Sequence, residues 1–135
     1  MNTNRRVWSL VAALILTIAA CASATGVPSP APGTGLAISA LAGPTCPVET
    51  IPPDPACAPR PVAGAKVIVL DAQGREVATV VLDAKGSAAV SLAAGNYVVR
   101  AQPTAGLMGT PEPMEVAVLD AKLTPVDLSY DTGIR

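Results

Sequence analysis

The sequence predicts an all-β protein, a seven-stranded Greek-key β-sandwich that follows an N-terminal signal helix and a flexible linker. Short runs rich in β-branched residues alternate with turn signals along most of the chain, which is typical of such a sandwich. No apolar repeat of helical period follows the leader. Because 50% of the residues are hydrophobic and only 14% are charged, the composition does not predict disorder.

Residues 1–20 have the features of a secretory signal peptide. Arg5 and Arg6 make the start of the chain positive, and the run Val7–Ala20 is apolar except for Ser9 and Thr17. As a helix of about 1.5 Å per residue, this run reaches only about 21 Å, less than the ~30 Å hydrocarbon core of a bilayer. We therefore expect a cleaved leader. A short membrane anchor that stays attached is the alternative.

The leader ends in the sequence Ile-Ala-Ala-Cys at residues 18–21. An aliphatic residue, two small residues and a cysteine resemble the lipobox of bacterial lipoproteins. The resemblance implies that Cys21 receives a diacylglyceryl group, that the chain is cut before it, and that lipid anchors the exported protein to the outer face of the bacterial cell membrane. Two or more acyl chains make such an anchor stable. An ordinary signal peptide, cut at an Ala-x-Ala site between residues 20 and 24, is the alternative.

The segment after the leader has the composition of a tether. Residues 21–34 contain Cys21 and are rich in Pro, Gly, Ser and Ala, with no apolar period. An extended tether of this length reaches about 40 Å from the membrane. Residues 35–135 have about the size of one small domain, and no second change of composition divides them. We expect a signal peptide over 1–20, the lipidated tether over 21–34 and one sandwich over 35–135.

Two cysteines remain once Cys21 carries lipid. Cys46 and Cys57 lie in a proline-rich stretch, and an even pair in an exported protein indicates a disulfide. Closing this loop stabilises the fold by about 3 kcal/mol in the chain-entropy model. A metal site needs more thiolates or imidazoles, and a redox site needs a closer spacing such as Cys-x-x-Cys. The loop either only stiffens the domain or also binds a partner through Ile51, Pro52 and Pro53.

The predicted strands follow the β-branched runs. They are Leu36–Ala42, Lys66–Leu70, Glu76–Leu82, Ser87–Leu92, Asn96–Gln102, Met114–Leu119 and Thr124–Tyr130. In the last strand Val126, Leu128 and Tyr130 share one face, which we expect to point into the core. Tyr97 is expected to face inward on its own strand. Because Pro125 has no N–H to donate, the last strand is predicted to lie at a sheet edge or to begin there.

Three of the predicted turns share the sequence Leu-Asp-Ala. Asp71 and Asp83 are followed three residues later by glycine, whereas the copy at Asp120 has leucine in that place. Asp favours such turns because its side chain accepts a hydrogen bond from the backbone two residues on, and Gly provides the positive φ. We therefore predict turns here. Calcium binding is the alternative, although the three aspartates are spread over different turns.

The stretch from Arg60 to Tyr97 resembles a known family pattern. Residues 61–71 read Pro-Val-Ala-Gly-Ala-Lys-Val-Ile-Val-Leu-Asp, and Asp-x-x-Gly, Asp-Ala-x-Gly and Leu-x-x-Gly-x-Tyr follow. This order is similar to that of carboxypeptidase-regulatory-like domains, which are seven-stranded, transthyretin-like (prealbumin-type) sandwiches close to the collagen-adhesin B repeat. The sequence departs at Ala88, where the family usually has Phe, and at Ala94, where Pro is common. The resemblance informs the fold and says little about function.

Some relatives in the collagen-adhesin group form an isopeptide bond between a lysine and an Asn or Asp. The corresponding pair here is Lys66 on the first core strand and Asp127 on the last. Both fall on the predicted outward faces of their strands, whereas the bond requires a desolvated amine and acid. We therefore expect two solvated charges rather than a cross-link.

The composition excludes several classes of function. The chain has no histidine, which removes Ser-His-Asp catalysis, Cys-His catalysis and His-ligated metals. Its formal net charge of −1 becomes −3 once the two leader arginines are removed, so no basic footprint for nucleic acid remains. No cofactor or metal is expected. A carboxylate pair, Glu49 and Asp54, is the one enzyme-like feature, and we expect both to be solvated loop charges.

The leading hypothesis is a non-enzymatic binding or structural module at the cell envelope, held to the membrane by lipid on Cys21. Its partner is expected to be an envelope protein or a glycan, met by loops at one end of the sandwich. Besides Ile51, Pro52 and Pro53, the segment Gln102–Pro113 offers Leu107 and Met108, which anchor a partner or cap the core. One alternative is a carbohydrate-binding (starch-binding-like) domain, although aromatics are only 2% of the chain. Another is a protease inhibitor that uses the Cys46–Cys57 loop as rigid bait.

Overall fold

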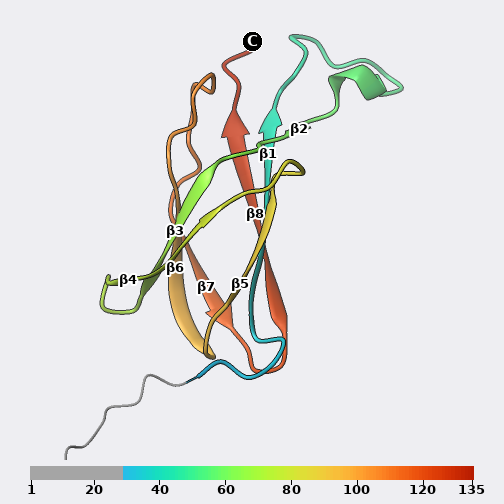
Figure 1. Ribbon diagram of the computed structural model, residues 1–135. Coiled ribbons are helices and arrows are strands. Elements are labelled where there is room, and N and C mark those ends of the chain that lie inside the picture. The colour runs from blue at the N-terminus through green and yellow to red at the C-terminus, as the bar shows by residue number, and fades with distance from the viewer. Residues whose placement is uncertain (1–28) are drawn as a thin grey trace, which may run out of the picture.

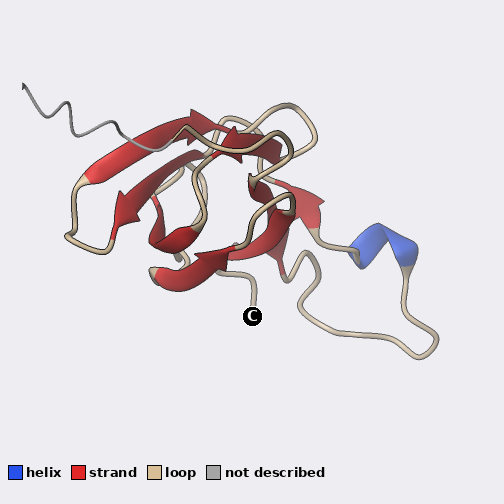
Figure 2. Ribbon diagram, turned by 90° about the horizontal axis from the view of Figure 1, so that it is seen from below, coloured by secondary structure: helices blue, strands red, loops and turns tan. Residues whose placement is uncertain are grey.

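The computed structural model describes residues 29–135 (Figure 1). The predicted signal peptide, Cys21 and the first part of the tether lie outside these residues. Within residues 29–135, no helix is long and apolar enough to span a membrane. From residue 35 onward the chain forms two β-sheets, one mixed and one antiparallel, that pack face to face. This arrangement confirms the predicted all-β sandwich (Figures 1 and 2).

The strands coincide closely with the predicted ones. They are β1 (Gly35–Gly43), β2 (Arg60–Pro61), β3 (Lys66–Asp71), β4 (Glu76–Val81), β5 (Ser87–Ser91), β6 (Gly95–Ala101), β7 (Met114–Val118) and β8 (Leu123–Asp131). The two-residue strand β2 and a short 3-10 helix, η1 (Pro55–Cys57), were not predicted. Both are too short to show a period in the sequence.

Strand β1 is the centre of the first sheet. It pairs in parallel with β8 along its whole length, from Gly35 opposite Leu123 to Gly43 opposite Asp131. On its other side it pairs antiparallel first with β5 and then with β2. The second sheet has the order β4-β3-β6-β7, with every neighbouring pair antiparallel. Among the described strands β8 pairs only with β1, so the edge position inferred from Pro125 is confirmed, and Pro125 lies within the strand.

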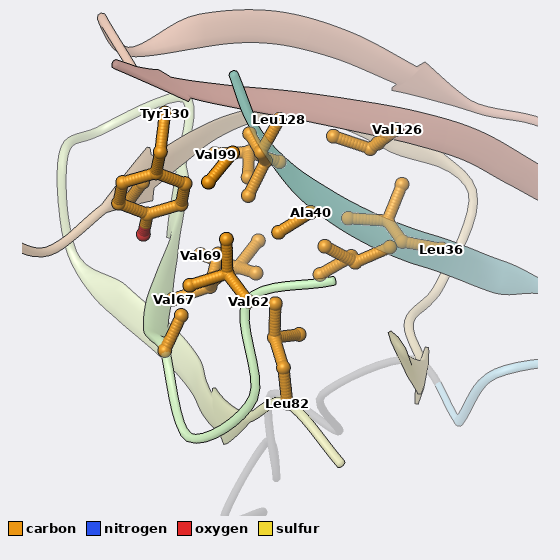
Figure 3. Packing of buried hydrophobic residues seen from close by; sticks show 14 of the residues in the cluster. Leu36, Ala40, Val62, Val67, Val69, Leu82, Val99, Val126, Leu128 and Tyr130 are labelled. Atoms are coloured by element: carbon orange, nitrogen blue, oxygen red, sulfur yellow. The ribbon is translucent and has the colours of Figure 1, made fainter. Parts of the chain in front are cut away.

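The core between the sheets is aliphatic except for Tyr130, as Figure 3 shows. Val126, Leu128 and Tyr130 all point into it, as their alternation predicts. Tyr130 is the one aromatic residue that is fully buried in the described part of the chain, and its hydroxyl donates to the main-chain oxygen of Gln102 at 3.1 Å. Tyr97 packs against the core from its margin and donates to the main-chain oxygen of Ala93 at 2.8 Å. Each tyrosine hydroxyl is thus satisfied inside the domain.

The turns at Asp71 and Asp83 have the same construction. Asp71 Oδ1 accepts from the N–H groups of Gln73 and Arg75, and Asp83 Oδ1 accepts from the equivalent two residues, Lys85 and Ser87. The glycines that follow, Gly74 and Gly86, have φ of 76° and 68°. The two aspartates therefore organise turns, as predicted. At the third copy Ala121 adopts the left-handed conformation, with φ of 54°, so this turn differs.

Lys66 and Asp127 lie on the outer faces of different sheets. Both residues are exposed, and Asp127 accepts a hydrogen bond from the Ser39 hydroxyl of the neighbouring strand β1. The sandwich core separates the two side chains. This placement agrees with two solvated charges and leaves no route to an isopeptide bond between them.

Candidate functional site

The two ends of the sandwich carry different segments of the chain. The tether enters β1 at one end, where Thr34 and Gly35 bond to the turn before β8, and we call this the tether end. At the opposite end lie the disulfide loop 44–59, the loop 102–113 and the residues 131–135, and we call this the loop end (Figure 1). Nine residues of β1 separate the two ends, or about 30 Å at the rise of a strand.

The disulfide loop is fastened at its base. Cys46 and Cys57 form the predicted disulfide, with their Cα atoms 5.3 Å apart. Next to it the Thr45 hydroxyl donates to the main-chain oxygen of Cys57. Asp54 caps the short helix η1 by accepting from the N–H of Ala56 at 2.8 Å. The base of the loop is therefore ordered by covalent and polar contacts, while the tip projects beyond them.

The tip of this loop is apolar and exposed. Ile51 is 100% exposed and Val48 is 70% exposed, while Pro52 and Pro53 next to Ile51 are also exposed. Val48 was missed in the sequence because a lone valine among prolines carries no pattern. Scattered exposed apolar residues are ordinary, but here two of them share one stapled loop. The arrangement presents a small apolar surface with little conformational entropy left to lose.

In the loop 102–113, one of the two candidate residues is exposed and the other is partly buried. Met108 is 81% exposed, and its side chain lies across Gly133, where an added Cβ would come within 2.3 Å of the Met108 Cγ atom. Leu107 is half-buried and packs against the core, so it caps the sandwich and does not project as an anchor. Its N–H donates to the main-chain oxygen of Thr104 at 3.2 Å and closes a turn that aims it inward. Of the two candidates, only Met108 is freely available at the surface.

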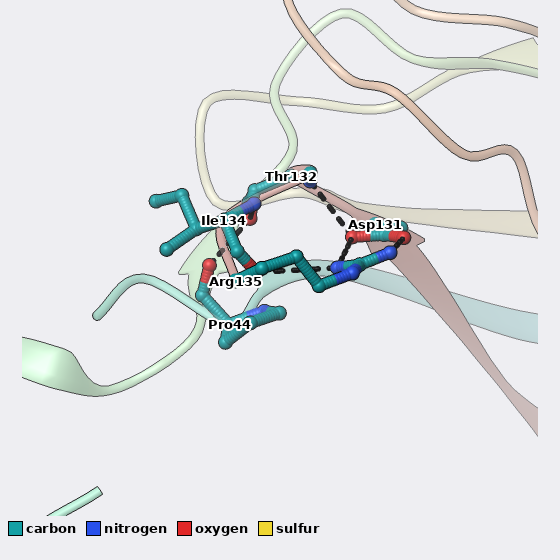
Figure 4. A network of polar contacts seen from close by, with 6 residues as sticks. Pro44, Asp131, Thr132, Ile134 and Arg135 are labelled. Atoms are coloured by element: carbon teal, nitrogen blue, oxygen red, sulfur yellow. Dashed lines mark hydrogen bonds and ion pairs between the residues drawn. The ribbon is translucent and has the colours of Figure 1, made fainter. Parts of the chain in front are cut away.

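The last residues fold back onto the loop end (Figure 4). Arg135 forms an ion pair with Asp131 at 2.7 Å, and the N–H of Gly133 donates to the same carboxylate at 2.7 Å. These contacts lower the pKa of Asp131 to about 2, and the hydrogen bond from Arg135 contributes most to the shift. The Thr132 hydroxyl donates to the main-chain oxygen of Pro44 and so ties this segment to the base of the disulfide loop.

A groove runs between these segments. It has a volume of about 360 Å³, and its walls come from the end of β1 with the base of the disulfide loop, from β2 and the two residues after it, from the turn 104–107 and from the C-terminal segment. Most of its lining side chains are small and apolar, and Arg60 is its one charged residue; the others are Ala42, Thr45, Pro61, Val62, Ala63, Thr104, Ala105, Leu107, Thr132 and Ile134. The sequence did not reveal the groove because its walls come from four distant parts of the chain.

A second hollow of about 370 Å³ lies within the disulfide loop itself. Glu49 and Asp54 both line it, but Asp54 is engaged as the cap of η1. A carboxylate in that role stabilises the loop. In residues 29–135 no group of three or more His, Cys, Asp or Glu residues is arranged to hold a metal ion.

Comparison with known proteins identifies the fold. No family model matches the sequence, and no curated protein matches it. Among solved structures the chain is similar to GBS52, the minor pilin of the gram-positive pathogen Streptococcus agalactiae, with a TM-score of 0.56 and 16% identity over 73% of this chain and 44% of that one. It is also similar to the Bacillus anthracis TIE protein, with a TM-score of 0.53 and 17% identity over 73% of this chain and 17% of that one.

The chain thus spans less than half the length of either structure. At these identities the likeness concerns the β-sandwich and not its ligands.

Proposed function

We propose that this protein is a non-enzymatic binding module of the cell envelope, anchored to the outer face of the membrane by lipid on Cys21. The tether holds the domain at one end, and the loop end binds an envelope protein. The contact surface consists of Ile51 and Val48 on the disulfide loop and Met108 on the loop 102–113, all of them exposed. The stapled loop supplies a rigid surface, and the sandwich acts as the spacer that carries it.

One observation carries this proposal: the tether and the two loops that carry Ile51 and Met108 lie at opposite ends of β1. An extended tether reaches about 40 Å and the sandwich adds about 30 Å, so a lipid on Cys21 would leave the loop end farthest from the membrane, within reach of a partner. The polarity of β1 therefore suits a module that presents its loops outward.

Further observations support the setting. The Cys46–Cys57 disulfide fits an oxidising compartment outside the cytoplasm, as the signal peptide and lipobox also do. One structural neighbour, which shares the β-sandwich, is a minor pilin. The resemblance to carboxypeptidase-regulatory-like domains gives the same architecture. Since the fold alone does not define a ligand, the binding role rests on the loop end.

The proposal favours a protein partner over a glycan. Sugar sites commonly use aromatic rings as platforms, but Tyr130 is buried and Tyr97 packs its ring against the core. The large apolar side chains exposed at the loop end, Val48, Ile51 and Met108, are aliphatic or contain sulfur, and such side chains pack against apolar protein surfaces.

Site-specific photo-crosslinking in intact cells tests this proposal. The photoreactive amino acid p-benzoylphenylalanine replaces Ile51 in one strain, Val48 or Met108 in two others, and Leu119 in a control strain. Leu119 is the matched control because it is 56% exposed, apolar and at the tether end. We expect a discrete cross-linked protein from position 51 at a yield several times that from position 119. Equal yields from the two positions, or no product from positions 48, 51 and 108, would contradict the proposal.

A further inference from the structure

The groove at the loop end combines an apolar lining with a single charge. Its lining contains no aspartate or glutamate, and Arg60 is exposed at its edge. Within residues 29–135 the Arg60 guanidinium makes no ion pair and no side-chain hydrogen bond, in contrast to Arg135, which is held by Asp131 nearby. A cation beside an apolar groove favours a ligand that is apolar with one negative group.

A second polar group in the groove also lacks a partner. Thr104 Oγ1 is buried and has no hydrogen bond, and it is the one side-chain oxygen or nitrogen of residues 29–135 in that condition. Buried hydroxyls are nearly always satisfied, and leaving one unpaired is costly. A rotation of 120° about χ1 moves the hydroxyl of a threonine to the position that the methyl group or the hydrogen held before. Since Thr104 lines the groove, such a rotation brings the hydroxyl to a ligand that can accept its hydrogen bond.

The main chain around the groove has free donors as well. The N–H groups of Ala63 and Ala105, both lining residues, donate no hydrogen bond within the described part of the chain. The groove volume of about 360 Å³ lies near the small end of the range for ligand sites, roughly 300–1,000 Å³. A guanidinium, a hydroxyl and main-chain N–H groups are all donors, so the matching ligand is rich in hydrogen-bond acceptors. Because the groove is small, the apolar groups of the ligand are small as well.

We propose that the groove binds the C-terminal carboxylate of a partner polypeptide that ends in small aliphatic residues. The carboxylate pairs with Arg60 and accepts from Thr104, the final aliphatic side chains lie against Val62, Leu107 and Ile134, and the partner's carbonyl oxygens accept from main-chain N–H groups. This inference rests on the proposed function, because it specifies how the loop end takes hold of its protein partner. A chain terminus supplies the charge, the acceptors and the apolar groups within a few residues.

The test uses the full chain, purified and immobilised. Two pools of decapeptides with the last three positions randomised are passed over it, one with free carboxylates and one with C-terminal amides. We expect the free-acid pool to be retained at least tenfold over the amide pool and to be enriched in peptides that end in Ala, Val, Leu or Ile. The best peptide is then measured by fluorescence polarisation against variants of the groove.

The variants separate recognition from folding. Arg60→Gln should weaken binding of the selected peptide by about tenfold or more, the range for a hydrogen bond to a charged group. Arg100→Gln, on the outer face of β6, is the control and should leave the affinity unchanged. Thr104→Val keeps the shape and should weaken binding without lowering Tm, because it removes a hydroxyl that has no partner in the free protein. A purely structural role for Thr104 would lower Tm instead.

The outcomes are distinct. Equal retention of the two pools, or full affinity in Arg60→Gln, overturns the inference. Binding of decanoate in place of any peptide, with the same dependence on Arg60, also overturns it and assigns the carboxylate to a lipid. If the cross-link from position 51 persists in Arg60→Gln cells, the proposed function stands while the groove inference fails. If the native protein retains no free-acid peptide and also gives no cross-link from position 51, both the groove inference and the proposed function fail.

Discussion

Thr34 Oγ1 accepts a hydrogen bond of 2.8 Å from the N–H of Ala121, which lies 87 residues away in the sequence. Thr34 is only 1% exposed, and its main-chain oxygen also accepts from the N–H of Leu92 at 3.3 Å. The residue that precedes β1 is thus bonded to the turn before β8 and to the end of β5. Although the sequence places Thr34 in the tether, it is part of the domain, and it fixes the point from which the tether leaves.

The Thr34→Val variant tests this fixed point. The substitution keeps the shape but leaves the Ala121 N–H without an acceptor in a left-handed turn, so we expect a loss of about 1–3 kcal/mol in the free energy of unfolding. Urea denaturation measures it. Thr50→Val is the control, because that hydroxyl is exposed and a surface change of this kind costs within about 0.5 kcal/mol. Equal effects from the two variants would show that the Thr34 contact is unimportant.

The matching turns at Asp71 and Asp83 allow a paired experiment on glycine. Gly74 and Gly86 have similar positive φ, but a Cβ on Gly74 meets nothing within 4 Å, whereas one on Gly86 lies 2.6 Å from the oxygen of Ala40. Gly74→Ala should cost about 1–2 kcal/mol from backbone strain alone. Gly86→Ala should lower the free energy of unfolding by about 1–3 kcal/mol more, because the added Cβ would be forced against main-chain atoms of Ala40, Pro61 and Val62. Thermal unfolding compares the stability of the two variants. Similar losses of stability would contradict the additional steric cost expected at Gly86.

Much of the fold follows from local patterns in the sequence. The seven longer strands and the turns at Asp71 and Asp83 depend on alternation and on Asp-Gly chemistry within a few residues, so the sequence predicted them well. The parallel pairing of β1 with β8 and the burial of Thr34 depend on residues far apart in the chain. No local pattern encodes them.

The candidate site was predicted only in part. The exposure of Ile51 and Met108 was anticipated from proline- and glycine-rich loops, and the disulfide from cysteine pairing. Leu107 was expected either to anchor a partner or to cap the core, and only the turn that begins at Thr104 decides for the core. The groove itself is formed by side chains from four segments and could be found only in three dimensions.

The disulfide should stabilise its loop without holding the core. No residue of the loop 44–59 belongs to the buried hydrophobic cluster. Replacing both Cys46 and Cys57 by Ser should therefore lower the free energy of unfolding by about 2–3 kcal/mol while the sandwich still folds. Guanidinium denaturation gives the loss, and far-ultraviolet circular dichroism checks the strands. Reductant should destabilise the native protein and leave the double variant unchanged; a reductant effect on the double variant would contradict this account.

The carboxylate of Asp131 makes the C-terminal segment sensitive to acid. Its folded pKa of about 2 lies below the ordinary 3.8, so its contribution to stability is present above about pH 4 and is lost as the pH falls through 2. Arg135→Gln removes the largest cause of this shift. We expect the pKa of Asp131, followed by NMR, to rise toward 3.8 in the variant, with the Gly133 N–H still holding it somewhat lower. An unchanged pKa would show that the ion pair is not formed in solution.

The intact mass of the protein from the membrane fraction tests the central claim most directly, since the outward presentation of the loop end depends on an anchor at Cys21. We predict a chain that begins at Cys21 and carries a diacylglyceryl group or more, with two hydrogens fewer for the Cys46–Cys57 disulfide. An inhibitor of the lipoprotein signal peptidase should leave the lipidated chain uncleaved, and Cys21→Ser should remove the lipid mass. An unlipidated chain that begins after Ala22 or Ala24 and is recovered outside the membrane fraction would contradict the account.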